Sequence, residues 1–477
     1  MSAFFSRACA AKNIMLACRL LRLYNIRSKQ GARKRPVRRN KMKDLKDRHV
    51  VVVSVDAMVY EDLETLSKLH AIESIWDKTA RVDHVRSIYP TITYPCHSTM
   101  MTGVYPETHG IVNNELPEVC VRSSLWQHER SMVHARSLFD WAKEAGLTTA
   151  AVFWPVTGND KNIDYLIDEY WPQHGESSEQ CFRDSGSSEE VMQKIVLPNL
   201  KFVENRHRQH PWCDAFVMTC ASDILREFKP NLLMVHPANV DAYRHETGLF
   251  TSRVTEGLYE TALWLSEMFK AAQDAGIYEK TDFFIVSDHG QLGIRRCVAL
   301  NALLAEHGLI DVAEDGKIRD YTAFAKSGGL SALVYMKNPD DAAALARTKA
   351  VLDELRASEL AGIGEVFTEA EAREKHHLGG KFSFVVETDG YTTFANDWVR
   401  PLVRPLDNSN YRFGRATHGH LPEKGPQPTL FSFGPHMRPG AVIRDARLVD
   451  EAPTFAHALG IEMTGIDGRC LTELFNE

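Results

Sequence analysis

The stretch HVVVVSVD (49–56) is an unbroken run of mostly β-branched residues that ends in an aspartate. Because apolar and polar residues do not alternate in it, the run is typical of a strand buried on both faces of a parallel sheet. Similar runs follow at 148–153, 231–236 and 282–287. Helical stretches lie between them, among them 188–203 and 212–228, and a closing helix is predicted at 451–459. This alternation predicts an α/β fold in which a mostly parallel central sheet is sandwiched by helices.

Acidic and imidazole side chains follow these runs. The carboxyl ends of parallel strands face one crevice, so side chains placed directly after them are expected to meet there. Asp56 alone could equally cap the helix predicted at 61–69, and Asp241 with His245, four residues apart on one helical face, could be a surface ion pair. The candidate metal ligands are Asp56, Asp241, His245, Asp288, His289 and His418. Zinc accepts mixed Asp and His ligands and needs three or four each, so six ligands and a hydroxyl predict two Zn²⁺ ions.

The hydroxyl comes from YPTITYPCHSTMMTGVYPETHGIVNN (89–114). Pro95 suits a first helical turn and Gly103 ends the helix, so Thr93 is expected at a helix N-terminus, where free N–H groups and the helix dipole favour an anion such as phosphate. A threonine at this place is more often only an N-cap. Two metal ions can clamp the attacking and leaving oxygens of a displacement at phosphorus and activate the hydroxyl, which favours Thr93 as a nucleophile and a metal ligand.

Three parts of the chain differ in character. Residues 1–48 hold fifteen Lys and Arg against two Asp and are predicted to be a basic, disordered leader, or else a patch that contacts anionic lipid or nucleic acid. The catalytic core is expected at 49–296 and 405–477, and an α+β cap at 297–404. Within the core, the polar residues 159–190 are predicted to form a long surface excursion.

Composition limits the function classes. A net charge of −7 gives no reason to expect a nucleic-acid partner, and no apolar run is long enough to span a membrane. Nine scattered cysteines without a CxxC pair favour a reducing compartment, so we expect a cytoplasmic protein. The oligomeric state cannot be read from these features.

Six motifs together resemble one family. They are VVVSVDA (51–57), the stretch at 89–114, FWPVTG (153–158), DAYRHETG (241–248), SDHG (287–290) and THGH (417–420). The chain resembles the alkaline phosphatase superfamily, and within it the nucleotide pyrophosphatase/phosphodiesterase family. The resemblance implies a hydrolase acting on phosphoric ester bonds, with a small phosphodiester or nucleotide as substrate and a covalent phospho-threonine intermediate on Thr93.

The resemblance also assigns roles to individual residues. It implies that Asp56, Asp288 and His289 hold one zinc ion beside Thr93, and that Asp241, His245 and His418 hold the other. Asn114 would donate to a phosphoryl oxygen. Tyr94, Trp154 and Tyr170 are expected beside the apolar or aromatic part of the substrate, although such residues more often serve packing.

Departures from the family pattern leave the substrate open. Cys96 stands where the family often has Asn, and CHSTM lacks the Pro and Arg of a sulfatase motif. Monoesterases of the threonine type use a Lys-x-Arg pair, and no such pair follows FWPVTG, which favours a diester or pyrophosphate substrate. A phosphomonoesterase or a phosphonoacetate-type phosphonate hydrolase remains the alternative, and an inactive metal-binding relative is the non-enzyme alternative.

Overall fold

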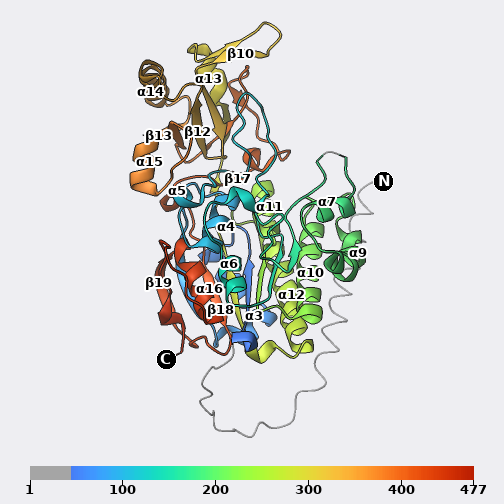
Figure 1. Cartoon of the computed structure of the whole chain (residues 1–477). Coiled ribbons are helices and arrows are strands. Elements are labelled where there is room, and N and C mark those ends of the chain that lie inside the picture. The colour runs from blue at the N-terminus through green and yellow to red at the C-terminus, as the bar shows by residue number, and fades with distance from the viewer. Residues whose placement is uncertain (1–44, 174, 477) are drawn as a thin grey trace, which may run out of the picture. The chain divides into compact units, whose positions relative to one another are not determined.

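The computed structural model describes residues 45–173 and 175–476 and is built on one eight-stranded sheet (Figure 1). Across the sheet the strands are β19 (Val442–Arg447), β2 (Ala80–Arg86), β18 (Leu430–Phe433), β6 (Thr281–Val286), β1 (His49–Ser54), β5 (Leu232–Val235), β3 (Thr149–Val152) and β4 (Tyr165–Ile167). Strand β18 is antiparallel to both its neighbours, and the other pairs are parallel. The predicted mostly parallel sheet is confirmed.

Helices cover both faces of the sheet because its central strands are apolar on both. Val51 and Val53 of β1 pack in one cluster that includes side chains of α10 (Trp212–Phe228) and α12 (Ser252–Asp274). Val50 and Val52 point the other way, into a cluster with α4 (Thr93–Thr102), α6 (Leu138–Glu144) and α16 (Glu451–Leu459). Figure 1 shows these two helical layers on either side of the sheet. The sandwich is therefore the α/β arrangement that the apolar runs predicted.

Three adjacent strands set the position of the site. Strand β1 lies between β5 and β6, with Val53 beside Val235 and Ser54 beside Val286. Their carboxyl ends are therefore level. The residues that follow these strands, Asp56, His236 and Asp288, lie together at the carboxyl end of the sheet, which is where open α/β sheets bind ligands.

A second, smaller α+β region lies beyond one end of the main sheet (Figure 1). Its antiparallel sheet has the order β11 (Ala323–Ser327), β12 (Ser331–Met336), β14 (Phe384–Thr388) and β13 (Ile363–Thr368). The helices are α13 (Leu300–Glu306), α14 (Ala342–Ala357) and α15 (Glu369–His376). Phe324, Leu352 and Val386 belong to its own hydrophobic cluster. The predicted cap is thus present as an α+β unit, while its boundaries at 297 and 404 stay a prediction.

The excursion predicted at 159–190 is only partly irregular. It contains β4, which pairs with β3 through Ala150 and Tyr165, and α7 (Ser178–Asp184). The strand escaped prediction because it has three residues, too few to show a period. The helix predicted at 188–203 is interrupted by a π turn (Met192–Val196), just before Pro198. Proline has no N–H to continue the helical hydrogen bonds, which accounts for the interruption.

Residues 1–44, which hold most of the predicted leader, lie outside the described residues. Within 45–173 and 175–476, no helix combines the length and apolarity that crossing a membrane requires. The seven cysteines of these ranges are free thiols. The cytoplasmic localisation stays a prediction.

Candidate active site

Thr93 is the first residue of α4, so it is not the N-cap of this helix. The N-cap is Ile92, with extended backbone, and Gly103 ends the helix in a left-handed conformation at φ 72°. The Thr93 hydroxyl lies 3.2 Å from Nε2 of His289. The hydroxyl therefore points toward the carboxyl ends of the central strands rather than toward the helix's own N–H groups. In the first turn the N–H of Tyr94 is donated to Asn114, Pro95 has no N–H, and the N–H of Cys96 is donated to the carbonyl oxygen of Ile92.

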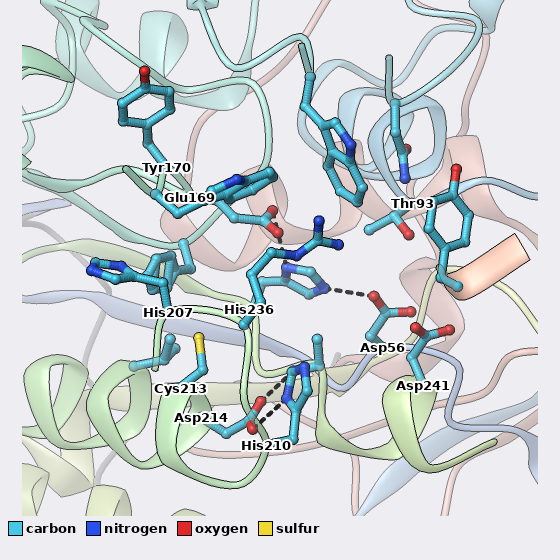
Figure 2. A pocket seen from close by; sticks show the side chains of 18 of the residues that line it. Asp56, Thr93, Glu169, Tyr170, His207, His210, Cys213, Asp214, His236 and Asp241 are labelled. Carbon is cyan, nitrogen blue, oxygen red and sulfur yellow. Dashed lines mark hydrogen bonds and ion pairs between the residues drawn. The ribbon is translucent and has the colours of Figure 1, made fainter. Parts of the chain in front are cut away.

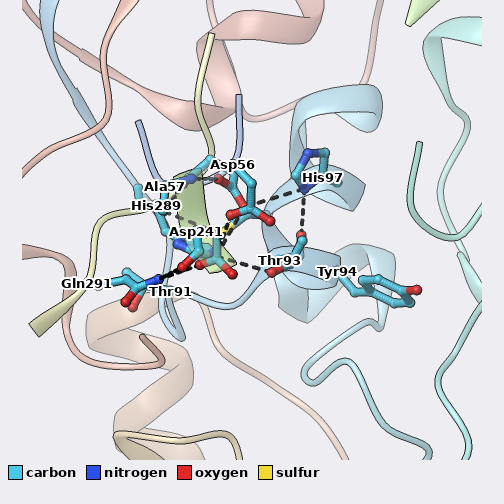
Figure 3. Close-up of polar contacts among 12 residues, drawn as sticks. Asp56, Ala57, Thr91, Thr93, Tyr94, His97, Asp241, His289 and Gln291 are labelled. Carbon is cyan, nitrogen blue, oxygen red and sulfur yellow. Dashed lines mark hydrogen bonds and ion pairs between the residues drawn. The ribbon is translucent and has the colours of Figure 1, made fainter. Parts of the chain in front are cut away.

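Asp56, Asp288 and His289 form the first group of candidate ligands. Figure 3 shows Asp56 and His289 near Thr93. Nε2 of His289 lies 3.2 Å from Oδ2 of Asp288 and 3.5 Å from Oδ1 of Asp56. Three oxygens, one of them from Thr93, thus surround a single imidazole nitrogen at nearly equal distances. Ligands bound at about 2.0–2.1 Å in a tetrahedron lie about 3.3 Å apart. The spacing is that of four ligands around one zinc-sized ion.

Asp241, His245 and His418 form the second group. Helix α11 (Asn239–Thr247) carries Asp241 and His245 on one face, and Oδ2 of Asp241 lies 3.0 Å from Nε2 of His245. His418 follows the strand β17 (Ala416–Thr417), far along the chain from α11. Its ring centroid lies 5.2 Å from that of His245 and 4.2 Å from that of His289. The His289–His418 contact makes the two groups neighbours.

The hydrogen-bonding state of these side chains fits bound cations. Within the described residues, buried side-chain nitrogen or oxygen atoms on five of the six candidates make no hydrogen bond of acceptable geometry. These atoms are Oδ1 of Asp56, Oδ2 of Asp288, Nδ1 of His289, Nε2 of His245 and Nδ1 of His418. Buried polar atoms are otherwise almost always paired, so this concentration at one place points to a missing partner. Carboxylates and imidazoles together are the donor set that zinc accepts.

The electrostatics of the protein alone point the same way. Burial, reinforced by the charge of Asp241, raises the pKa of Asp56 to about 7. Burial together with Asp56 holds the pKa of Asp288 well above its usual range. Burial also lowers the pKa of His418 to about 3, and burial together with His418 holds that of His289 well below its ordinary value. Asp56 and Asp288 thus crowd together while the imidazoles of His289 and His418 are held neutral, and a bound cation would stabilise both conditions.

Two supporting residues were missed by the sequence analysis. His236 lies with Nε2 3.0 Å from Oδ2 of Asp56 and Nδ1 3.6 Å from Glu169, so it joins the candidate ligand to the pocket wall (Figure 2). Gln291 donates to Oδ1 of Asp241 at 2.5 Å (Figure 3). Such partners fix the orientation of a ligand carboxylate. His236 ends the run at 231–236, so the rule that found Asp56 could have found it.

Asn114 lies close to the start of α4. Its side-chain oxygen accepts a hydrogen bond from the backbone N–H of Tyr94 at 2.8 Å. With the oxygen engaged, the –NH₂ end is the one that a ligand in the pocket would meet. Asn114 lines the same pocket as Thr93. The geometry agrees with its predicted role as a donor to a phosphoryl oxygen, which stays a prediction.

The three predicted aromatic contacts are placed differently from one another. Tyr170 lines the pocket that also contains Thr93 (Figure 2). Tyr94 is fully buried with its ring centroid 5.2 Å from that of Trp126, and it points away from Asp56 (Figure 3). Trp154 is fully buried against His97, at 4.9 Å between ring centroids. Neither Tyr94 nor Trp154 is among the lining residues, so the structure brings only Tyr170 to the pocket.

Further aromatic and charged residues line the pocket. Trp126, Trp171 and Tyr411 add aromatic wall, and Arg208 and His210 come from the segment just before α10. Nδ1 of His210 lies 2.7 Å from the buried carboxylate of Asp214 (Figure 2). No sequence period connects this segment to the strand ends, so only the folded chain shows that it faces Thr93.

The chain is similar in sequence to known proteins. The family model described as Type I phosphodiesterase / nucleotide pyrophosphatase matches residues 50–418. Ectonucleotide pyrophosphatase/phosphodiesterase family member 1 of Homo sapiens is 22% identical over 268 residues, 54% of this chain and 25% of that protein. Ectonucleotide pyrophosphatase/phosphodiesterase 1 of Saccharomyces cerevisiae is 26% identical over 274 residues, 52% of this chain and 33% of that protein. The chain thus spans a quarter to a third of the length of these relatives.

Solved structures show the same fold. Murine ectonucleotide pyrophosphatase/phosphodiesterase 5, as an inactive form in complex with AMP, superposes with a TM-score of 0.63 at 17% identity. The match covers 90% of this chain and 100% of the murine chain. At this identity the likeness speaks for the fold alone. Because the family model covers residues 50–418, well over half of the sequence, the chain belongs to the type I phosphodiesterase / nucleotide pyrophosphatase family of the alkaline phosphatase superfamily.

Proposed function

We propose that this chain is a two-zinc phosphodiesterase or nucleotide pyrophosphatase that hydrolyses phosphodiester or pyrophosphate bonds of small nucleotide-type substrates. The observation that carries the proposal is the convergence of Thr93, Asp56 and Asp288 on one nitrogen of His289 at 3.2–3.5 Å. A hydroxyl in that position would serve as both a metal ligand and a nucleophile. The murine relative solved with AMP supports a nucleotide as substrate.

The residues of the chain divide the work as follows. Asp56, Asp288 and His289 would hold one ion, and Asp241, His245 and His418 the other. Bound there, two zinc ions would supply the positive charge that lowers the pKa of the Thr93 hydroxyl and stabilises the attacking and leaving oxygens. Other divalent metals accept the same donors, but imidazole-rich sites favour zinc over magnesium or calcium.

Thr93 would act in two steps. In the first, its Oγ1 forms a bond to phosphorus as the bond from phosphorus to the leaving oxygen breaks, which leaves a phospho-threonine. In the second, water attacks the same phosphorus and releases the hydroxyl of Thr93. The –NH₂ of Asn114 and the backbone N–H of Thr93 would face the negative charge that develops on the phosphoryl oxygens in both steps.

The test compares two ester classes on purified, zinc-loaded protein, with a chelated sample as control. We expect kcat/KM for bis-p-nitrophenyl phosphate, or for the p-nitrophenyl ester of thymidine monophosphate, to exceed that for p-nitrophenyl phosphate, and the activity to vanish with chelator. A ratio below one would make the chain a phosphomonoesterase. Turnover of phosphonoacetate in the absence of ester hydrolysis would make it a phosphonate hydrolase.

A further inference from the structure

Arg208 lies between η5 (Leu200–Phe202) and α10 and lines the same pocket as Thr93 and Asp241. We propose that Arg208 selects substrates in which a second phosphate is attached to the attacked phosphorus, as in the pyrophosphate bond of a nucleoside triphosphate. The inference rests on the proposed function and narrows it from phosphodiesters in general to pyrophosphates. The argument starts from how the guanidinium is held.

Two indole rings position the cation. The guanidinium carbon of Arg208 lies 4.6 Å from the ring centroid of Trp126 and 4.7 Å from that of Trp171. The two rings meet edge to face, at 82° and 5.1 Å, so the guanidinium lies in the angle between them. Cation–π contacts of this kind hold an arginine without using its N–H groups. The donors of Arg208 are therefore oriented and still available to a ligand.

The pairing of charges around Arg208 leaves it without a counter-charge. It forms no ion pair or hydrogen bond with any residue in the described part of the chain, whereas Arg130 and Arg412 lie 2.8 and 2.9 Å from carboxylates. Arg208 is also exposed, so a ligand can reach it. A guanidinium that lines a pocket and has no ion-pair partner can bind an anion.

The carboxylates of the same pocket lie beside groups other than Arg208. Asp214 lies 2.7 Å from His210 and accepts the N–H of Ala238 at 2.8 Å. Glu169 lies 3.6 Å from His236. Asp56 and Asp241, the other carboxylates that line the pocket, belong to the two proposed metal groups. None of these carboxylates forms an ion pair with Arg208, so we expect its counter-charge to be one that the substrate brings.

The chemistry of the substrate follows from this count of charges. The single negative charge of a simple diester would be met by the metal ions, Asn114 and the start of α4. A pyrophosphate adds a second phosphate next to the first, and a guanidinium presents a planar pair of donors that matches two phosphate oxygens. A leaving group that carries phosphate would thus gain a contact that a nitrophenyl leaving group cannot make.

The experiment compares two substrates that share the AMP moiety: ATP, cleaved at the α-phosphorus to AMP and pyrophosphate, and the p-nitrophenyl ester of AMP. The variant is Arg208→Gln, which keeps a polar side chain but shortens it and removes its charge. We expect the ratio of kcat/KM for ATP to kcat/KM for the ester to fall about 10- to 100-fold, the range for hydrogen bonds to charged groups.

Arg206→Gln is the matched control. Arg206 is an exposed arginine two residues away that lies over Trp212 at 4.6 Å and does not line the pocket. We expect the ratio in this variant to stay within twofold of wild type. An Arg208→Gln ratio equal to wild type overturns the inference, and so does an equal fall in both variants. A fall in the relative rate for p-nitrophenyl phosphate without a fall for ATP also overturns it.

The outcomes separate this inference from the proposed function. If wild type hydrolyses no phosphoric ester, the proposed function fails, and calorimetric binding of ATP to the zinc-loaded wild type and to Arg208→Gln still tests Arg208. We expect about 10- to 100-fold weaker binding of ATP by the variant, from the same hydrogen-bond range. Equal affinities would overturn the inference. If wild type hydrolyses the esters and Arg208→Gln keeps the ratio, only the inference fails.

Discussion

Glu115 is the centre of a buried ion cluster that joins the cap to the loop carrying Asn114. Its Oε2 lies 2.8 Å from Nζ of Lys326 on β11, and its Oε1 lies 2.9 Å from Nη2 of Arg412. All three side chains are at most 2% exposed. One carboxylate thus serves two buried cations, one from the cap and one from the return to the core. Removing each member should therefore have a different cost.

We predict that Glu115→Gln lowers the free energy of unfolding by about 3–5 kcal/mol, the cost of leaving a buried ion pair with one partner removed. Lys326→Met should cost less, about 1–2 kcal/mol, because Glu115 keeps Arg412 as its counter-charge and a hydrocarbon chain replaces the buried ammonium. The double variant, Glu115→Gln with Lys326→Met, should be more stable than the sum of the two single losses predicts. In Glu115→Gln both Lys326 and Arg412 lose their carboxylate, whereas the double variant leaves only Arg412 unpaired.

The assay is equilibrium unfolding in urea, followed by tryptophan fluorescence and by circular dichroism, with coincident curves as the condition for extracting free energies. Glu107→Gln is the control, because Glu107 pairs with the half-exposed Arg373 at 3.4 Å, and surface pairs contribute about 0–1 kcal/mol. A loss below about 1 kcal/mol for Glu115→Gln, or a larger loss for Lys326→Met, would refute the reasoning.

Three further predictions concern single residues. Thr93→Ala should abolish turnover, by more than about 10³-fold, while metal content by mass spectrometry stays close to wild type; retained turnover would remove Thr93 as the nucleophile. His236→Ala should weaken metal affinity at the site beside Thr93 about 10- to 100-fold, because His236 holds Oδ2 of Asp56 at 3.0 Å; equal affinity in chelator competition would contradict this role. Burial raises the pKa of Glu387 to about 7 despite Lys424 at 2.9 Å. A carboxyl with a raised folded pKa contributes stability that is present below pH 4.5 and lost as the pH rises through about 7. Glu387→Gln should remove up to about 3 kcal/mol of this pH dependence, and an unchanged slope between these pH values would argue against the raised pKa.

Much of the fold could be predicted because apolar runs report strands that are buried on both faces. The helices predicted at 212–228 and 451–459 have the bounds found in α10 and α16. Strands β2 and β19 were missed because they lie at one side of the sheet, are partly exposed and carry charged residues. Their pairing is decided by neighbouring strands rather than by their own sequence.

The candidate ligands could be found because Asp and His residues come soon after the ends of the buried strands. All six lie in the two groups implied by the family resemblance. The pocket walls could not be found in this way. Arg208 and Trp171 come from loops whose positions depend on the packing of α10 and on the path after β4. Tyr94 stands next to Thr93 in the sequence, yet the helical turn between them directs its ring into the core. Neighbours in sequence need not share a pocket.

The number of metal ions per chain tests the two-metal account most directly. We predict two zinc ions per wild-type chain after loading and dialysis, one per chain in both Asp241→Ala and His418→Ala, and one per chain in Asp288→Ala. The first two variants should lose the same ion and the third the other, as shown by the metal remaining in pairwise double variants. One ion or none in wild type, or full stoichiometry in either Asp241→Ala or His418→Ala, would contradict the division of the six ligands into two sites.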